Sequence, residues 1–131
     1  MISPDQFREF VQPSLRRQCE ILDHSLYHLD GPDAIRHLDA ILEVEELDAL
    51  QFTAGAGQTP PSDPKWDSIH DKVKAAGKCL WIRIRGKCFE ELKNAAQHQV
   101  DRHGRDGLYL QFPPMTEAEG RELLRHAEKN W

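Results

Sequence analysis

The feature that most constrains the fold is a regular switch between two hydrophobic periodicities along the chain. Four short segments alternate apolar and polar residues: 25–30, 48–53, 79–85 and 108–112. Each is followed by a segment in which apolar residues recur at helical spacing, as at Ile35, Leu38 and Ile41. Strands that alternate with helices predict a parallel sheet, because neighbouring parallel strands need a crossover connection. Right-handed crossovers then leave a doubly wound sheet or part of a β/α barrel.

The helical segments are delimited by turn and capping residues. Pro13 and Pro32 suit the first turn of a helix, and residues 55–61 are too rich in Gly and Pro to be anything but loop. Thr116 and Glu119 have the spacing of a capping box. A chain of 131 residues has room for one domain of ordinary size. We therefore expect a single α/β domain over 1–131, with an N-terminal helix followed by four strand–helix units.

Composition narrows the classes of function. Lys and Arg total 17 against 22 Asp and Glu, a formal charge of −5, which argues against a general nucleic-acid binder. No segment approaches the ~20 apolar residues of a membrane span, and no signal peptide precedes Ser3. Three cysteines are too few for a disulfide-stapled secreted scaffold. These features predict a cytoplasmic protein that does not contact membranes.

The expected strands carry one aliphatic and one polar face, unlike the continuous apolar runs of fully covered parallel strands. The polar faces share one side of the sheet. Their members are His28, Asp30, Gln51, Thr53, Arg83, Arg85, Tyr109 and Gln111. Burying such groups without partners costs roughly 1–3 kcal/mol each. The set therefore forms either a saturated internal network or the lining of a ligand pocket at the carboxyl ends of the strands.

Several side chains of this polar set have two interpretations. Arg83 and Arg85 would either pair with Asp30 in a structural ion cluster or bind a carboxylate or phosphate of a small anionic ligand. His28 would be either a hydrogen-bonded structural histidine or, with Asp30, an acid/base or metal-ligand pair. Gln51, Tyr109 and Gln111 would orient the ligand.

Two further groups of residues bear on the site. Gly55 and Gly57 would either cradle an anion with their backbone N–H groups or shape the rim of the pocket. Four histidines fall on helical segments, where we expect them to be solvated. They are His37, His70, His98 and His126.

The most distinctive stretches are Tyr27-His-Leu-Asp-Gly31, Leu47-Asp-Ala-Leu-Gln-Phe52, Gly55-Ala-Gly57 and Trp66. With these, the chain resembles the C-terminal half of uroporphyrinogen-decarboxylase-like proteins, a superfamily that includes corrinoid-dependent methyltransferases. The resemblance implies the last four strands of a TIM barrel, binding a small anionic or tetrapyrrole-like ligand or taking part in methyl transfer.

The methyltransferase branch of this superfamily holds zinc through a His-x-Cys pair and a later cysteine. His28 matches the histidine, Asp30 replaces the first cysteine, and the stretch Gln111–Pro114 holds no cysteine. The resemblance therefore leaves His28 and Asp30 as candidate ligands of a divalent metal such as zinc. The decarboxylase branch takes key substrate-binding residues from the barrel's first half, which has no counterpart here.

Four strand–helix units would leave two sheet edges unpaired and the polar face without an opposite wall. We expect closure by a homo-oligomer or by an N-terminal half-barrel chain. The sheet would also be completed if this chain were a piece of a longer protein. The alternative function is a non-catalytic interaction module whose polar face is covered by a partner.

Overall fold

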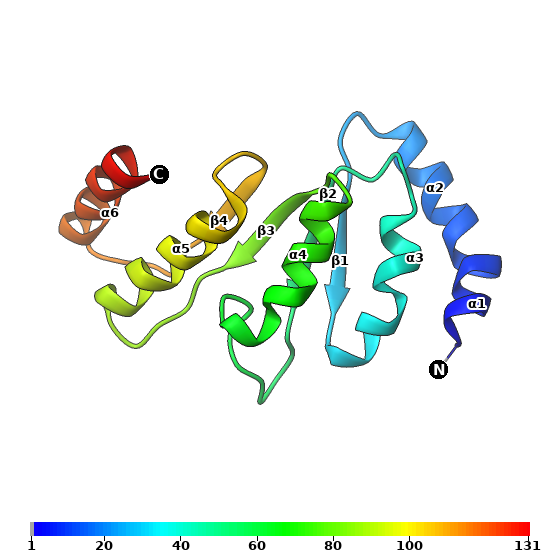
Figure 1. The fold of residues 1–131 in the computed structure, drawn as a ribbon, viewed down its shortest axis with the longest axis horizontal. Helices are drawn as coiled ribbons and strands as arrows, with labels where there is room; N and C mark the ends of the chain where they lie inside the picture. The colour runs from blue at the N-terminus through cyan, green and yellow to red at the C-terminus, as the bar shows by residue number, and fades with distance from the viewer. Residues whose placement is uncertain (1) are drawn as a thin grey trace.

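The computed structural model describes residues 2–131 and contains one four-stranded parallel sheet in the order β1-β2-β3-β4 (Figure 1). The strands are β1 (Leu26–Asp30), β2 (Ala49–Thr53), β3 (Cys79–Arg83) and β4 (Leu108–Gln111). All four coincide with expected strands, which confirms the parallel α/β class. The sheet bonding extends one residue beyond β3, because the Ile84 amide donates to the Gln111 carbonyl at 2.8 Å.

Helices cover one face of the sheet. They are η2 (Pro32–His37) running into α3 (Leu38–Leu42), η3 (Pro64–Trp66) running into α4 (Asp67–Ala75), and α5 (Phe89–His103). Figure 1 shows α3, α4 and α5 side by side on the same side of the sheet. None of the helices in residues 2–131 combines the length and apolar character that a membrane crossing requires.

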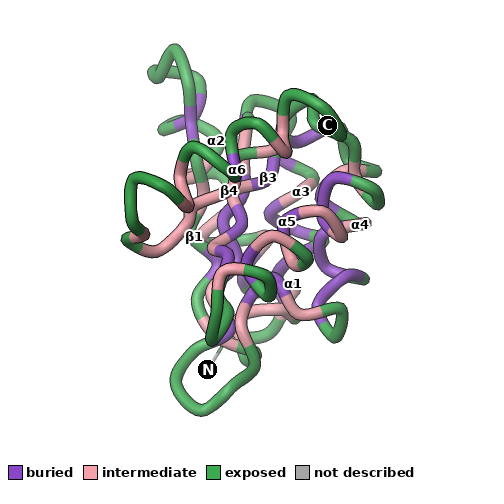
Figure 2. Tube along the Cα trace, turned by 90° about the vertical axis from the view of Figure 1, so that its left-hand side faces the viewer, coloured by how far each residue is buried: buried purple, intermediate pink, exposed green. Residues whose placement is uncertain are grey.

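The core lies between this helical layer and the aliphatic face of the strands. Leu50, Leu80, Ile82 and Ile84 are each no more than 2 % exposed. Figure 2 shows buried residues along the strands and the inward turns of the helices. The alternation of the strands therefore sorts side chains as expected, with the aliphatic members meeting the helices.

A continuous helical segment precedes β1. It comprises α1 (Pro4–Gln6), the π-helical η1 (Phe7–Val11) and α2 (Gln12–Ile21). Pro13 lies in the first turn of α2, as expected, and α2 continues η1 without a break. Pro13 has no N–H to give to a preceding carbonyl, and the π-helical turns before it accommodate that break. Arg8 and Gln12 anchor the segment to the end of α3 by hydrogen bonds to Glu43.

The last helix, α6 (Glu117–Asn130), begins at the expected capping box. The Thr116 side chain accepts from the Glu119 amide, and the Glu119 carboxylate accepts from the Thr116 amide at 2.8 Å. The helix packs on α5, where Gln97 accepts hydrogen bonds from His126 and Trp131. Figure 1 shows α6 and α2 at opposite ends of the molecule, beyond the two edge strands.

Candidate functional site

The uncovered face of the sheet carries the polar side chains. Register places His28 beside Gln51, Gln51 beside Trp81, and Trp81 beside Tyr109, so these four residues form one row across all the strands. A second row, nearer the carboxyl ends, pairs Asp30 with Thr53 and Arg83 with Gln111. His28 and Asp30 are exposed and Tyr109 is 59 % exposed, so in the single chain this face is open to solvent.

His28 is held by its neighbour on β2. Its Nδ1 atom lies 2.8 Å from Oε1 of Gln51, which is buried. Because a carbonyl oxygen only accepts, Nδ1 is the donor of this hydrogen bond, and in the neutral ring the lone pair lies on Nε2. His28 therefore presents a basic nitrogen to the open face, as an acid/base group requires.

The side chain of Gln111 connects the two rows, because it contacts one residue of each. Its Oε1 accepts from Trp81 Nε1 and from Arg83 Nε, both at 3.3 Å. The bond at Nε leaves the two terminal nitrogens of Arg83 free for another acceptor. Gln111 therefore acts on Arg83 by orienting its side chain.

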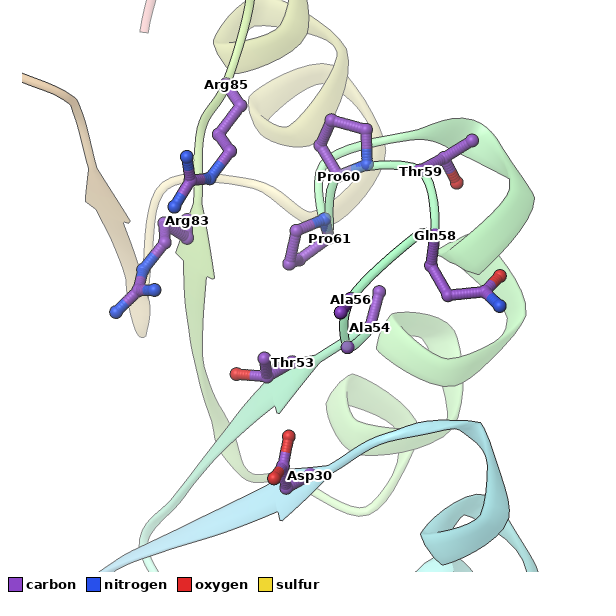
Figure 3. A pocket seen from close by; sticks show the side chains of 11 residues that line it. Asp30, Thr53, Ala54, Ala56, Gln58, Thr59, Pro60, Pro61, Arg83 and Arg85 are labelled. Carbon is purple, nitrogen blue, oxygen red and sulfur yellow. The ribbon is translucent and has the colours of Figure 1, made fainter.

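A cavity of about 570 Å³ lies at the carboxyl ends of β1, β2 and β3. Asp30, Arg83 and Arg85 line one side of it, and the loop at 54–61 lines the other (Figure 3). Its volume falls in the usual range for small-molecule sites, roughly 300–1,000 Å³. A smaller groove beside it is lined by Arg83, Arg85 and Gln111.

The ion cluster is not formed. In residues 2–131, no ion pair involves Arg83, Arg85 or Asp30. Arg83, the last residue of β3, is half-buried, and Arg85, just beyond it, is exposed. Figure 3 shows both side chains on the same side of this segment. Two guanidinium groups beside one cavity and without a carboxylate partner create a positive site for an anion.

The loop that closes the cavity depends on two glycines with positive φ. Gly31 has φ 79° and Gly55 φ 85°, and the Gly31 amide donates to the Thr53 carbonyl at 2.8 Å. The loops after β1 and β2 therefore pass close together: an added Cβ on Gly55 would lie 3.9 Å from Gly31 Cα and Pro32 Cδ. Gly55 lines the cavity, whereas Gly57 is not among the lining residues.

The predicted residues thus divide into two groups. Asp30, Gly55, Arg83 and Arg85 meet at the cavity, and Gln111 lies in the adjoining groove. His28, Gln51 and Tyr109 lie one row back on the open face.

Several residues of this region were not predicted. They are Trp81 on the open face and Gln58, Thr59, Pro60 and Pro61 at the cavity. Strand alternation already places Trp81 with the polar residues, so its position was available from the sequence. The loop residues are brought in by the path that the chain takes after Gly55, which no local pattern reveals.

The two candidate metal ligands, His28 and Asp30, are not joined by a third. In the described part of the chain, three side chains with metal-binding atoms gather at one place only, Asp67, His70 and His103. His37 and His70 are buried, contrary to the expected solvation, and His98 and His126 are half-buried. His70 falls on the same helical face as Trp66, Ile69 and Val73, which carries it into the core.

No family profile, no curated protein and no solved structure matches this chain.

Proposed function

We propose that the chain binds a small anionic ligand, with carboxylate or phosphate groups, at the carboxyl ends of its strands. The observation that carries this proposal is the pair Arg83 and Arg85, which line the same cavity and have no carboxylate partner in residues 2–131. Guanidinium groups suit both ligand classes because their donors match two acceptor oxygens at once.

Other groups at the strand ends have roles consistent with such a ligand. Gln111 fixes Arg83, and Asp30 on the cavity wall would accept a hydrogen bond from a hydroxyl or amine of the same ligand. Asp30 and His28 would carry any proton transfer, His28 through its free Nε2. The specific ligand that we propose is the one implied by the resemblance to uroporphyrinogen-decarboxylase-like proteins. It is either a tetrapyrrole-like polycarboxylate or a substrate of methyl transfer.

We further propose that the ligand site is completed by a second half-barrel, either another copy of this chain or an N-terminal half-barrel chain. The edge strands β1 and β4 each pair on one side only, and α2 and α6 extend beyond those edges (Figure 1). If a second sheet continues the barrel, the free strand edges become paired and the open polar face becomes covered. The same geometry supports the second candidate function, a non-catalytic module whose open face serves only to bind a partner.

Ligand binding is tested by calorimetry and thermal shift with citrate, pyrophosphate and uroporphyrin. The double variant Arg83→Gln/Arg85→Gln removes both guanidinium groups, and Arg17→Gln/Arg105→Gln removes the same charge from exposed positions outside the cavity. We expect one of the anions to stabilise the wild type and the control variant, and to lose at least about tenfold in affinity in the cavity variant.

Three results would oppose the anion site. Equal binding by both double variants would show that the anions bind elsewhere. Unfolding of the cavity variant alone would assign the arginines a structural role. Absence of binding by every anion, with a stable oligomer in light scattering, would instead favour the interaction module.

A further inference from the structure

A second cluster of reactive side chains lies between α4 and α5. Asp67 and His70 are three residues apart on α4 and so share a helical face, and His103 is the last residue of α5. One potential ligand atom from each side chain lies within 4.8 Å of the others. Tetrahedral zinc with ligand bonds of about 2.1 Å needs donor atoms about 3.4 Å apart. Small rotations of the three side chains would bring their donor atoms to this separation.

Two of the three side chains are buried with an unused nitrogen. His70 is 1 % exposed and the side chain of His103 is 2 % exposed. Nδ1 of His70 and Nε2 of His103 have no hydrogen-bond partner. The side chain of Gln99 is a neighbour that can hydrogen-bond to His70. Buried polar atoms in folded proteins are nearly always partnered, so Nε2 of His103 calls for a further partner.

The surroundings favour a cation. Oδ1 of Asp71 lies 3.8 Å from Nδ1 of His103, so a second carboxylate stands beside the cluster. Burial lowers the pKa of His70 to about 4 and also lowers the pKa of His103.

The charges around the cluster are two carboxylates, one guanidinium and one ammonium group. Asp67 accepts from Nε2 of His98 at 3.0 Å, and a terminal nitrogen of Arg102 lies 3.5 Å from the same carboxylate. Arg102 donates mainly to Asp71, at 2.9 and 2.6 Å. Lys74, the other nearby cation, donates to the Asp106 carbonyl at 2.7 Å. Both carboxylate oxygens of Asp67 thus lie at hydrogen-bond distance from His98, which fixes the orientation of the carboxylate toward the cluster.

We propose that Asp67, His70 and His103 bind a divalent transition-metal ion, with zinc as the best match to the donors. Two imidazoles and one carboxylate with an open fourth position suit zinc or cobalt, whereas calcium and magnesium prefer sites made only of oxygen. The ion would join α4 to α5 across the helical layer. This site is separate from the anion cavity and does not depend on the function proposed for it.

The test uses the whole chain, freed of metal by a chelator and titrated with Co²⁺ and then Zn²⁺ near pH 7.5. We expect the intense visible absorption of four-coordinate cobalt at one ion per chain, its loss on zinc addition, and a higher Tm with zinc than without. His103→Gln and His70→Gln should each weaken cobalt binding at least about tenfold. His24→Gln changes an exposed histidine and should bind as the wild type does.

The proposal fails if the folded wild type gives no such absorption, or if His103→Gln retains it at wild-type affinity. An equal rise of Tm with Ca²⁺ would also oppose it, because this donor set does not suit calcium. Should His70→Gln not fold, Asp67→Asn and His103→Gln, read by the same cobalt spectrum, decide the question.

Discussion

The rings of Trp81 and Tyr109 meet edge to face on the open side of the sheet, with centroids 5.1 Å apart and planes 78° apart. Trp81 is half-buried and Tyr109 is 59 % exposed, although both lie in the middle of their strands. Exposed aromatic side chains of this kind are frequent where proteins associate. The pair therefore adds an aromatic patch, next to the edge strand β4, to the face that we propose a second half-barrel covers.

Tyr109→Ser should weaken self-association at least about tenfold. The reason is that an aromatic ring buried in an interface commonly contributes about 2 kcal/mol to the free energy of binding. Tyr109→Phe keeps the ring and should associate as the wild type does. Sedimentation equilibrium over micromolar concentrations measures both. A wild type that stays monomeric throughout this range would contradict closure by a second copy.

Ile82→Ala should lower the free energy of unfolding by about 2–5 kcal/mol, because Ile82 is fully buried on β3 and truncation leaves a cavity. Ile21→Ala makes the same chemical change at a site that is 82 % exposed, and should cost less than about 0.5 kcal/mol. Urea unfolding followed by circular dichroism gives both values. Similar losses in the two variants would mean that β3 does not form the core.

Lys78→Met should destabilise the fold by about 1–3 kcal/mol. Lys78 is only 8 % exposed, and its Nζ donates to the carbonyls of Val44 and Glu45, both at 2.8 Å. Without the ammonium group, these two carbonyls after α3 lose their partner. Lys74→Met is the matched control, since Lys74 makes one exposed bond to a carbonyl. Urea unfolding should show a small loss for the control; equal losses would count against this role.

Stability should fall as the pH drops below about 6.5, in part through His37. Its ring stacks on Phe7 with centroids 4.7 Å apart, and burial, aided by the charge of Arg36, lowers its pKa. A lowered folded-state pKa means that the folded chain binds fewer protons than the unfolded chain, so stability is greatest above the unfolded-state pKa. His37→Phe should flatten the decline of Tm between about pH 7 and pH 5. An unchanged slope would exclude His37 as a contributor.

The strand positions and the sorting of the two sheet faces were predictable because both follow from local periodicity, whereas the strand order was not, since the same periodicity fits a doubly wound sheet. Leu80 and Ile82 alternate with Trp81 and Arg83, and that pattern alone assigns each side chain to a face. The metal-binding cluster was not predicted, because His103 joins Asp67 and His70 only through the packing of α5 on α4. Nor could sequence tell that Asp30 and Arg83 remain apart, since an ion pair depends on rotamers that the neighbouring loops set.

The sequential order of the strands bears on how the chain folds. Because β1 to β4 pair strictly with their neighbours in the chain, each new strand–helix unit docks on the one that precedes it. Such connectivity keeps the loop-closure entropy of each strand pairing smaller than in a sheet whose neighbouring strands lie further apart in the chain. A further strand–helix unit could be added at the edge of the sheet without rearranging the four units that are already there.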